Sequence, residues 1–542
     1  MRKNIKFMKL IFEDKNRVVF LIILIFVHSL VEIFSQYYAS HIMDIINYSN
    51  DGNIILFALN ILLKIFLVFV FETIFEYFKE YYKLKILSRF RNNLRKMVSM
   101  KINSYSYESF KENDTGKFIS WLSTDVGQIS NYGFNSFFDM YKYAFTFFIS
   151  ILFIFFMSPL ISIVVFLMSI FTLVMPIIFN NIIDKVSREK SKANDEFTEE
   201  IKNYILGYDV FTLNSLKKIF FEKIMKSSYK YEKKYFEYTK KVRIVYILRK
   251  LFSMIPFTIT LGIAAFSIVK YNLPMRHFLG TILICNITYG AIISFFSVKA
   301  TLDSTIPIFE KYTIEVDEEE LDKEKEDISE IDSNKIKVSN ISFSYKEGKE
   351  ILKNFSTEFA YPSKYFIVGK SGGGKTTLLK LIQGLYEVNS GEISIGDKNI
   401  KNLSKKSLRE IFGYLSQDIY LFTGTIRENI TLWQEYSDEE IWKVLKMCKI
   451  EEYVKSLEKG LDTVILENGK NISGGQRQRI GLSRLLLRNP KYLLIDEGTS
   501  QLDEENRLGI EETLLNLEDK GVLIITHNLQ ENYDKRCSIV EV

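Results

Sequence analysis

Six runs of apolar residues lie within the first 302 positions, and each is long enough to cross a lipid bilayer as a helix. A spanning helix needs about 20 predominantly apolar residues to cross ~30 Å of hydrocarbon. The runs lie near residues 18–38, 54–74, 134–157, 159–180, 251–270 and 278–298. No small-residue cleavage site follows the first run, which therefore predicts a retained span and not a signal peptide. The pattern predicts an all-α membrane domain over residues 1–302.

Positive charge between the runs predicts how the spans are oriented. The segments 75–133 and 181–250 are rich in Lys and Arg, whereas 39–53 has none and 271–277 has only Arg276. Cytoplasmic loops of membrane proteins carry an excess of these residues. We therefore expect the N-terminus and both long connections to lie in the cytoplasm, and the protein to be a multi-pass protein of the cytoplasmic membrane.

The two long connections have few Gly or Pro residues and predict helices that continue from the spans far into the cytoplasm. Breaks in this pattern fall near Asn113 and near Tyr204, where Gly116 and Gly207 interrupt the helix-forming residues. Short helices at these breaks are placed to touch a partner below the membrane.

Ionisable residues within the predicted spans are candidates for a polar substrate cavity, because charges inside a bilayer are costly. Asp139 and Lys142 lie in the third span, and three others are the first candidates. His28 and Glu32 are four residues apart in the first span and share a helix face, and Lys64 lies in the second span. The alternative is that these groups pair with one another or extend to the interface.

After the spans the composition changes. Residues 1–302 carry 38 Lys and Arg against 23 Asp and Glu, whereas residues 303–542 carry 33 against 43. The acidic stretch 303–334 predicts a solvated linker. The membrane topology explains the positive half, so we expect no nucleic-acid partner. Three scattered cysteines, Cys285, Cys448 and Cys537, form neither a disulfide framework nor a metal-binding spacing.

From residue 335 to 542, short β-branched runs alternate with helical segments, which predicts an α/β domain with a largely parallel sheet. The stretch "GKSGGGKT" at 369–376 fits G-x-x-x-x-G-K-[ST] between a predicted strand and a helix, the context that a phosphate-binding loop requires. Lys375 is expected to contact the β- and γ-phosphates, and Thr376 to hold Mg²⁺. The predicted phosphate-binding residues are Gly369, Lys370, Ser371, Gly372, Gly373, Gly374, Lys375, Thr376 and Thr377.

A second motif supplies the acidic residues that such a site needs. In "YLLIDE" at 492–497, four apolar residues predict a buried strand, and Asp496 at its C-terminal end faces the metal. Glu497 is placed to polarise an attacking water. Together the two motifs predict a bound nucleotide with Mg²⁺ and attack of an activated water on its phosphate.

With these motifs the chain resembles the ATP-binding cassette (ABC) transporters, chiefly through "NISGGQRQR" from Asn471. The fold class that follows is an all-α six-helix transmembrane domain followed by an α/β P-loop NTPase domain. The resemblance implies that Tyr345 stacks on adenine and that Gln417 reaches Mg²⁺, while Asp496 acts on the metal through water. It implies, in addition, a catalytic His527 near the γ-phosphate. It also implies a D-loop residue, Asp503, and a signature formed by Ser473, Gly474, Gly475 and Gln476.

Six spans fused before one cassette are similar to the exporter group of this family, in which two cassettes bind ATP head to tail. The signature then acts on the partner's ATP, so the chain is half of a transporter. All catalytic positions are of the active type, which favours a homodimer over a heterodimer. "TGKFISWLSTDV" from Thr115 resembles the group's first coupling helix, and the break at Tyr204 should be the second.

Two departures from the family pattern concern the cassette. Gly498 stands where the family usually has Ala, which removes no catalytic group. The sequence ends 15 residues after His527, so "CSIVEV" can supply one strand where the family has more. We expect an ATP-driven exporter with a peptide cargo; a lipid or an amphipathic drug is the alternative cargo, and an ATP-gated channel or sensor is an alternative of another class. The intact Glu497 argues against the channel, since gating needs binding more than turnover.

Overall fold

The computed structural model of the chain divides into two compact units. The helical unit comprises Met1–Met100 and Thr115–Glu315, and the α/β unit comprises Lys101–Asp114 and Val316–Val542. The structure describes residues 2–47, 54–113, 115–172, 174–312, 335–345, 349–496, 504–526 and 537–542.

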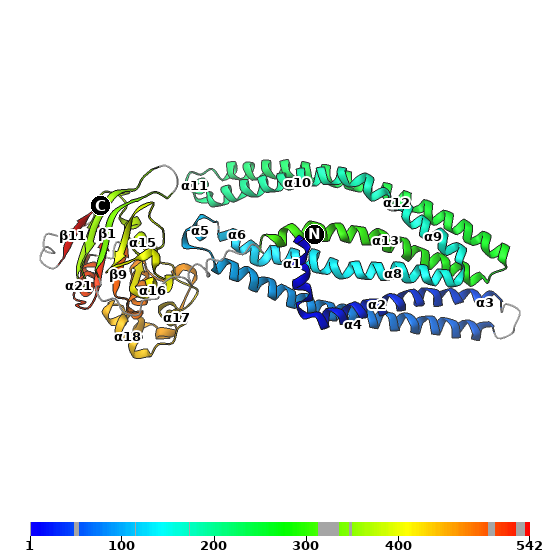
Figure 1. The fold of residues 1–542 in the computed structure, drawn as a ribbon, viewed down its shortest axis with the longest axis horizontal. Coiled ribbons are helices and arrows are strands. Elements are labelled where there is room, and N and C mark those ends of the chain that lie inside the picture. The colour runs from blue at the N-terminus through cyan, green and yellow to red at the C-terminus, as the bar shows by residue number, and fades with distance from the viewer. Residues whose placement is uncertain are drawn as a thin grey trace. The chain divides into compact units, whose positions relative to one another are not determined.

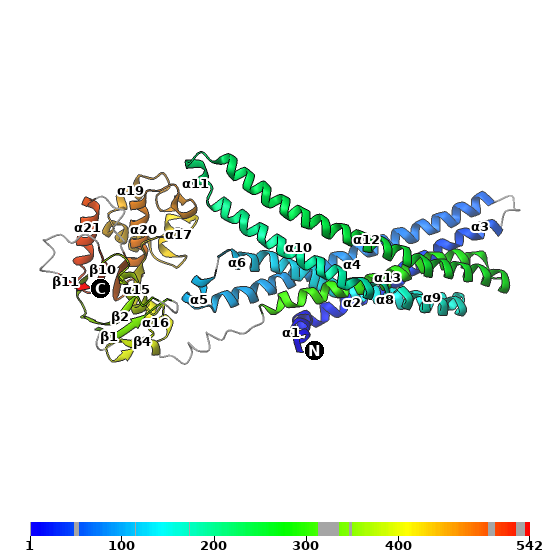
Figure 2. The ribbon, with the colours of Figure 1, turned by 90° about the horizontal axis from the view of Figure 1, so that it is seen from above.

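Long helices form the helical unit, with α2 and α13 packed against α8, and α10 packed along α12 (Figures 1 and 2). The helices up to the middle of the unit are α1 (Arg2–Ile11), η1 (Phe12–Asp14), α2 (Lys15–Ala39), η2 (Ser40–Met43), α3 (Asp44–Asn47), α4 (Ile54–Asn103), α6 (Thr115–Ser120), η3 (Trp121–Asp125), α7 (Val126–Gln128) and η4 (Ile129–Phe134). They are followed by α8 (Asn135–Met157), α9 (Pro159–Thr172), α10 (Val174–Leu206), α11 (Tyr208–Leu213), α12 (Lys217–Tyr271) and α13 (Met275–Glu310).

Within the described residues, five helices are long and apolar enough to cross a membrane. They are Phe7–Met43, Ile54–Asn103, Thr115–Met157, Lys217–Tyr271 and Met275–Glu310. Five of the six predicted spans fall inside these helices. The fourth, 159–180, begins with the shorter apolar helix α9 and includes residue 173, which is outside the described residues. The total of six spans therefore stays a prediction.

Both helical extensions predicted from the sequence are present as parts of single long helices. α4 has 50 residues and runs from an apolar stretch into a charged one, whereas α12 has 55 and runs from a charged stretch into an apolar one. The break near Tyr204 falls at Gly207, between α10 and α11. Helix α13 continues to Glu310, so the domain boundary predicted at residue 302 falls inside a helix.

The predicted first coupling helix, from Thr115, lies next to a second short helix of the same connection. Residues from Thr115 onward, which form α6, belong to the helical unit, whereas the α/β unit includes the short helix α5 (Tyr107–Glu112). Ser106 begins α5, because its hydroxyl accepts a hydrogen bond from the backbone N–H of Ser109 at 3.1 Å. The coupling helix from Thr115 stays a prediction, and α5 is the part of this connection that packs on the α/β unit.

In the α/β unit, two main sheets share one domain. The antiparallel sheet has the order β2-β1-β4-β5, the parallel sheet has the order β11-β3-β10-β9-β6, and β7 pairs with β8. The strands are β1 (Ile336–Phe343), β2 (Leu352–Phe359), β3 (Lys364–Val368), β4 (Ser390–Ile395), β5 (Lys398–Asn399), β6 (Phe412–Leu415), β7 (Gly424–Thr425), β8 (Val464–Ile465), β9 (Tyr492–Asp496), β10 (Gly521–Ile525) and β11 (Ser538–Glu541). The helices are α15 (Lys375–Ile382), η5 (Ile400–Asn402), α16 (Lys405–Ile411), α17 (Ile426–Thr431), α18 (Asp438–Met447), α19 (Glu451–Ser456), η6 (Gly460–Asp462), η7 (Glu467–Gly469), α20 (Gly474–Leu487) and α21 (Glu504–Leu515).

The central strands of the parallel sheet are apolar and buried. All five residues of β9 and of β10 are buried, which is typical of strands covered on both faces. β3 and β9 both pair in parallel with β10, so their C-terminal ends meet at one edge of the sheet. The predicted fold class is confirmed; the antiparallel sheet beside the parallel one was not predicted.

Candidate functional site

The loop after β3 is shaped by glycines. Gly372 and Gly374 have φ of 77° and 103°, a region that residues with a side chain rarely adopt. A Cβ at Gly374 would also come within 2.8 Å of the Leu352 side chain. The loop leads directly into α15, whose free N-terminal N–H groups can bind an anion.

Lys375, the first residue of α15, is only 6% exposed. Its Nζ donates hydrogen bonds to the backbone carbonyl oxygens of Gly369 at 2.9 Å and of Lys370 at 3.0 Å. The loop's own carbonyls therefore hold the ammonium group inside the loop. This arrangement places a positive charge where the sequence predicted a phosphate contact.

At the adjoining strand end, β9 brings Asp496 to this loop. Thr376 Oγ1 donates to Asp496 Oδ1 at 2.9 Å, although the two residues are 120 positions apart. Asp496 is 3% exposed. A hydroxyl and a carboxylate side by side are the hard oxygen ligands that Mg²⁺ prefers, so the residues present fit the predicted cation.

A residue that the sequence analysis missed completes this contact. Tyr414, on β6, donates from its hydroxyl to Asp496 Oδ2 at 2.8 Å. Burial, together with the neighbouring Asp496 carboxylate, raises the pKa of Tyr414 well above its usual range, so the phenol stays protonated and donates. Its only sequence signal was its place on a short strand three residues before Gln417.

An aromatic cluster surrounds the tyrosine predicted to stack on adenine. The Tyr345 hydroxyl lies 3.1 Å from Thr377 Oγ1, and its ring is 37% exposed. Tyr386 packs edge-to-face on the Tyr345 ring at 5.1 Å between centroids, and Tyr107 of α5 packs edge-to-face on Tyr386 at 5.8 Å. Tyr386 thus connects Tyr345, the predicted adenine contact, to α5.

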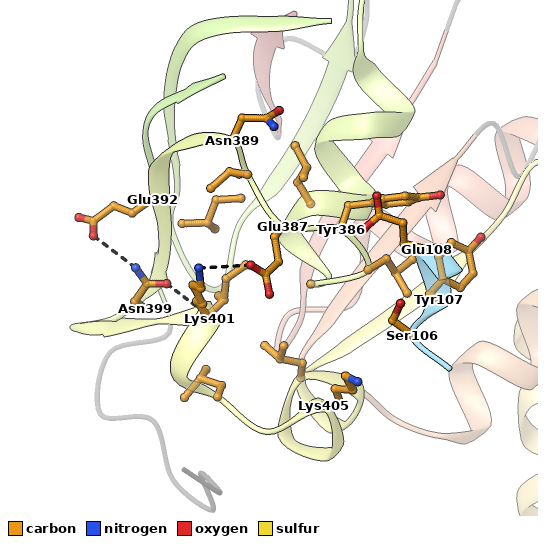
Figure 3. Close-up of a pocket in the computed structure, with 18 of the residues that line it drawn as sticks. Ser106, Tyr107, Glu108, Tyr386, Glu387, Asn389, Glu392, Asn399, Lys401 and Lys405 are labelled. Carbon is orange, nitrogen blue, oxygen red and sulfur yellow. Dashed lines mark hydrogen bonds and ion pairs between the residues drawn. The ribbon is translucent and has the colours of Figure 1, made fainter. Parts of the chain in front are cut away.

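The same helix lines a cavity of about 920 Å³ (Figure 3). Ser106, Tyr107 and Glu108 lie on one side of it, and Glu387 and Lys401 lie on the other, joined by an ion pair at 3.2 Å. Among the described residues, the phosphate-binding loop does not contribute to its lining. The cavity therefore lies between α5 and the residues of the α/β unit on which α5 packs, and it is separate from the phosphate site.

The signature forms a second helix N-terminus. Ser473 begins α20 with a capping box, in which its Oγ accepts from the Gln476 N–H at 3.2 Å and its own N–H donates to Gln476 Oε1 at 2.9 Å. Ser473 is exposed, so the helix end is open to an anion from outside the domain. Gln417 lines a separate hollow of about 300 Å³ with Asp418 and Arg477.

Three predicted residues, Glu497, Asp503 and His527, lie outside the described residues. In the helical unit, His28 is 2% exposed and stacks on Phe75 of α4, with 6.3 Å between the ring centroids. Glu32 is partly buried. Lys64 is exposed, so the structure does not bury it as a cavity residue.

Two family models match the chain: the ABC transporter transmembrane region over residues 18–292 and the ABC transporter model over residues 352–500. An uncharacterized ABC transporter ATP-binding protein, YwjA of Bacillus subtilis (strain 168), is 27% identical over 487 residues, which are 86% of this chain and 82% of the relative.

Other relatives align with this chain over only about a third of their own length. A multidrug resistance ABC transporter ATP-binding and permease protein of Lactococcus lactis subsp. lactis is 37% identical over 202 residues, which are 37% of this chain and 34% of the relative. An ATP-dependent lipid A-core flippase of Pasteurella multocida is 40% identical over 206 residues, which are 37% of this chain and 35% of the relative.

The fold also matches a solved structure of a bacterial Atm1-family ABC exporter with ATP bound. The TM-score is 0.81 at 18% identity, and the match covers 97% of this chain and 93% of the other. At this identity the match shows a shared fold. Since the transmembrane model alone covers half of the sequence, the chain belongs to the ABC transporters: it is a half-transporter of the exporter type, with a membrane domain fused to a cassette that hydrolyses ATP coupled to transport.

Proposed function

We propose that the chain is one half of a dimeric exporter that moves an amphipathic molecule, a lipid or a drug-like compound, out of the cytoplasm. The contact that carries the proposal is the Thr376–Asp496 hydrogen bond at 2.9 Å, which joins the phosphate-binding loop to the end of β9 in a chain with membrane-spanning helices. It brings together the two motifs on which ATP turnover depends.

The residues of the cassette divide the chemistry as follows in this proposal. The N–H groups of residues 369–377 and Lys375 bind the phosphates, and the Tyr345 ring stacks on the base. Thr376 and Gln417 would hold Mg²⁺, with Asp496 acting on it through water, and the metal would supply positive charge to neutralise the phosphates. Glu497 polarises the attacking water and His527 contacts the γ-phosphate.

The exposed N-terminus of α20 supports a dimer. Ser473, Gly474, Gly475 and Gln476 present a capped helix end that faces outward. A helix end of this kind binds phosphate, and in the dimer it covers the γ-phosphate held by the partner's loop. Two identical copies suffice, because every catalytic position carries an active residue.

The cargo assignment rests on the helical unit and on the relatives' names. An apolar groove of about 520 Å³ is lined by Leu30, Val31, Phe34, Leu67, Val68, Phe71 and Phe153. It suits a hydrocarbon part of a cargo. Relatives named for multidrug resistance and for lipid A-core flipping favour the same class. The peptide cargo expected from the sequence has no such support and now ranks behind it.

ATP turnover of the purified chain in lipid nanodiscs tests the proposal, titrated separately with lipid, amphipathic drug and peptide. The blank is Glu497→Gln, which we expect to bind ATP but lose nearly all turnover. Stimulation by lipid or drug, with ATP-dependent uptake of the same compound into inside-out vesicles, is the expected result. Stimulation by peptide alone would return the cargo to the sequence-based expectation. Turnover without uptake of any compound would favour a channel or sensor.

A further inference from the structure

A stretch of α4 carries an unusual number of charges at the depth of the first span. Phe75 stacks on His28, in the middle of the predicted span 18–38, and Tyr82 packs edge-to-face on Phe20 at 5.1 Å. The charged residues of α4 between these contacts therefore lie beside the inner half of that span. They need partners there, since an unpaired charge inside a bilayer is costly.

Most of these charges are paired within the helical unit. Lys79, only 2% exposed, lies 3.3 Å from Glu80 and 3.8 Å from Glu76. Lys83 lies 3.0 Å from Asp139 of α8 and 3.3 Å from Glu80. These pairs are internal, although Lys79 Nζ makes no hydrogen bond among the described residues.

Two carboxylates form no ion pair among the described residues. Glu32 of α2 has a buried Oε2 without a hydrogen-bond partner, and Glu72 of α4 accepts a hydrogen bond from the Ser35 hydroxyl. The two lie close enough for their charges to interact, and Lys142 of α8 is the cation whose charge reaches Glu72. Neither carboxylate lies within 4 Å of a lysine or arginine nitrogen among the described residues, so both are available to a cation from outside the protein.

His28 adds a second observation at the same place. It is 2% exposed, and neither ring nitrogen has a hydrogen-bond partner in the described part of the chain. It lies one helical turn from Glu32 on the same face of α2. A buried polar ring without partners is rare unless something else satisfies it.

An apolar groove is lined by sequence neighbours of these groups, although the carboxylates and His28 are not part of its lining. Val31 and Phe71, which line it, are the chain neighbours of Glu32 and Glu72, and Phe34 precedes Ser35. Three of its lining residues are aromatic: Phe34, Phe71 and Phe153. An apolar, partly aromatic groove next to unpaired carboxylates suits a molecule with an apolar body and a positive charge.

We propose that Glu32 and Glu72 bind the positive charge of an amphipathic cation whose apolar part occupies the groove between α2, α4 and α8. The proposal rests on the proposed function, because it names the charge class of the exported molecule. His28 then supplies a hydrogen-bond donor or acceptor to the polar part of the cargo.

Two ions of matched size and opposite charge, tetraphenylphosphonium and tetraphenylborate, test the proposal on the full chain in nanodiscs. Equilibrium dialysis measures binding without ATP, and ATP turnover is measured in parallel. We expect the cation to bind and the anion to bind at least about tenfold more weakly, since only the cation meets the two carboxylates. Equal or tighter binding of the anion would overturn the proposal.

Glu32→Gln and Glu72→Gln should each weaken binding of the cation by about tenfold, the loss of one partly buried charge partner. Glu72→Asp should restore part of it. Glu76→Gln is the matched control, because Glu76 is one turn away on α4, 51% exposed and paired with Lys79. Unchanged binding in both carboxylate variants would overturn the proposal, because Gln keeps the shape of a protonated Glu and removes only the charge.

A cysteine probe shows whether the groove is open in the assembled protein. Phe34→Cys should react with N-ethylmaleimide, and tetraphenylphosphonium but not tetraphenylborate should protect it. Lack of reaction in the assembled protein would mean that lipid or a second copy covers the groove, which refutes an open site. The two proposals fail differently. If amphipathic compounds stimulate turnover regardless of charge, only the cation site is wrong. If no amphipathic compound is transported, the proposed cargo class itself is wrong.

Discussion

Tyr414→Phe tests the structure of the ATP site most directly, because it removes one oxygen and keeps the ring. The Tyr414 hydroxyl donates to Asp496 Oδ2 at 2.8 Å, while Thr376 donates to the other oxygen at 2.9 Å. Asp496 is 3% exposed, so water does not readily replace the lost donor. The carboxylate then loses one of the two hydroxyls that fix its orientation towards the metal position.

The expected cost follows from the type of hydrogen bond. A hydrogen bond to a charged group contributes about 1.5–3 kcal/mol, and each 1.4 kcal/mol is about tenfold in an equilibrium constant. We therefore expect the Mg²⁺ concentration for half-maximal turnover to rise about tenfold in Tyr414→Phe. A fluorescent ATP analogue, titrated with Mg²⁺ on the nanodisc-bound chain, measures the same effect without turnover.

Tyr361→Phe is the matched control for this experiment. Its hydroxyl donates to the backbone carbonyl of Asp519 at 2.6 Å, so the same atom is lost from a neutral hydrogen bond to another part of the α/β unit. Its Mg²⁺ dependence should equal that of the wild type. If Tyr414→Phe also keeps the wild-type Mg²⁺ dependence in both assays, Tyr414 does not orient Asp496, and the reasoning is wrong.

Three further predictions concern the cassette. Tyr107→Ala removes the ring that packs on Tyr386 and should weaken ATP binding about threefold, since an edge-to-face pair contributes about 0.5–1.5 kcal/mol; nucleotide titration measures it, and Tyr107→Phe should bind as the wild type does. Gly413→Ala places a Cβ 2.3 Å from the Leu485 side chain and should cost about 1–3 kcal/mol by overpacking, seen as a lower urea midpoint; an unchanged midpoint would contradict this packing. Lys375→Ala should abolish detectable ATP binding in a filter assay, and retained binding would contradict its placement in the loop.

The parts of the cassette that could be predicted are those in which adjacent residues carry both structure and chemistry. An apolar run followed by a glycine-rich loop predicted β3 and the start of α15, and "YLLID" predicted β9 with Asp496 at its end. Because parallel strands end at one edge of the sheet, the meeting of Thr376 and Asp496 followed from the motifs alone.

The contacts that could not be predicted depend on residues that are far apart in the sequence and belong to no motif. Tyr414 is recognisable as functional only when β6 is known to pair with β9. Tyr386 lies just after α15, and its contacts with Tyr345 and Tyr107 depend on how three separate segments fold together. A tyrosine in a sequence with 31 of them carries no signal of its own.

Hydropathy does not show which charges of α4 are paired. It placed the second span at 54–74 and assigned the charges that follow to the cytoplasm, because a hydropathy window averages over residues and cannot detect pairing. The structure sets Phe75 against His28, in the middle of the first predicted span, and buries Lys79 beside Glu80. Pairing makes such a stretch tolerable at that depth. The same argument marks Glu32 and Glu72: where neighbouring charges are neutralised by ion pairs, carboxylates without one are the groups left to act on a cargo.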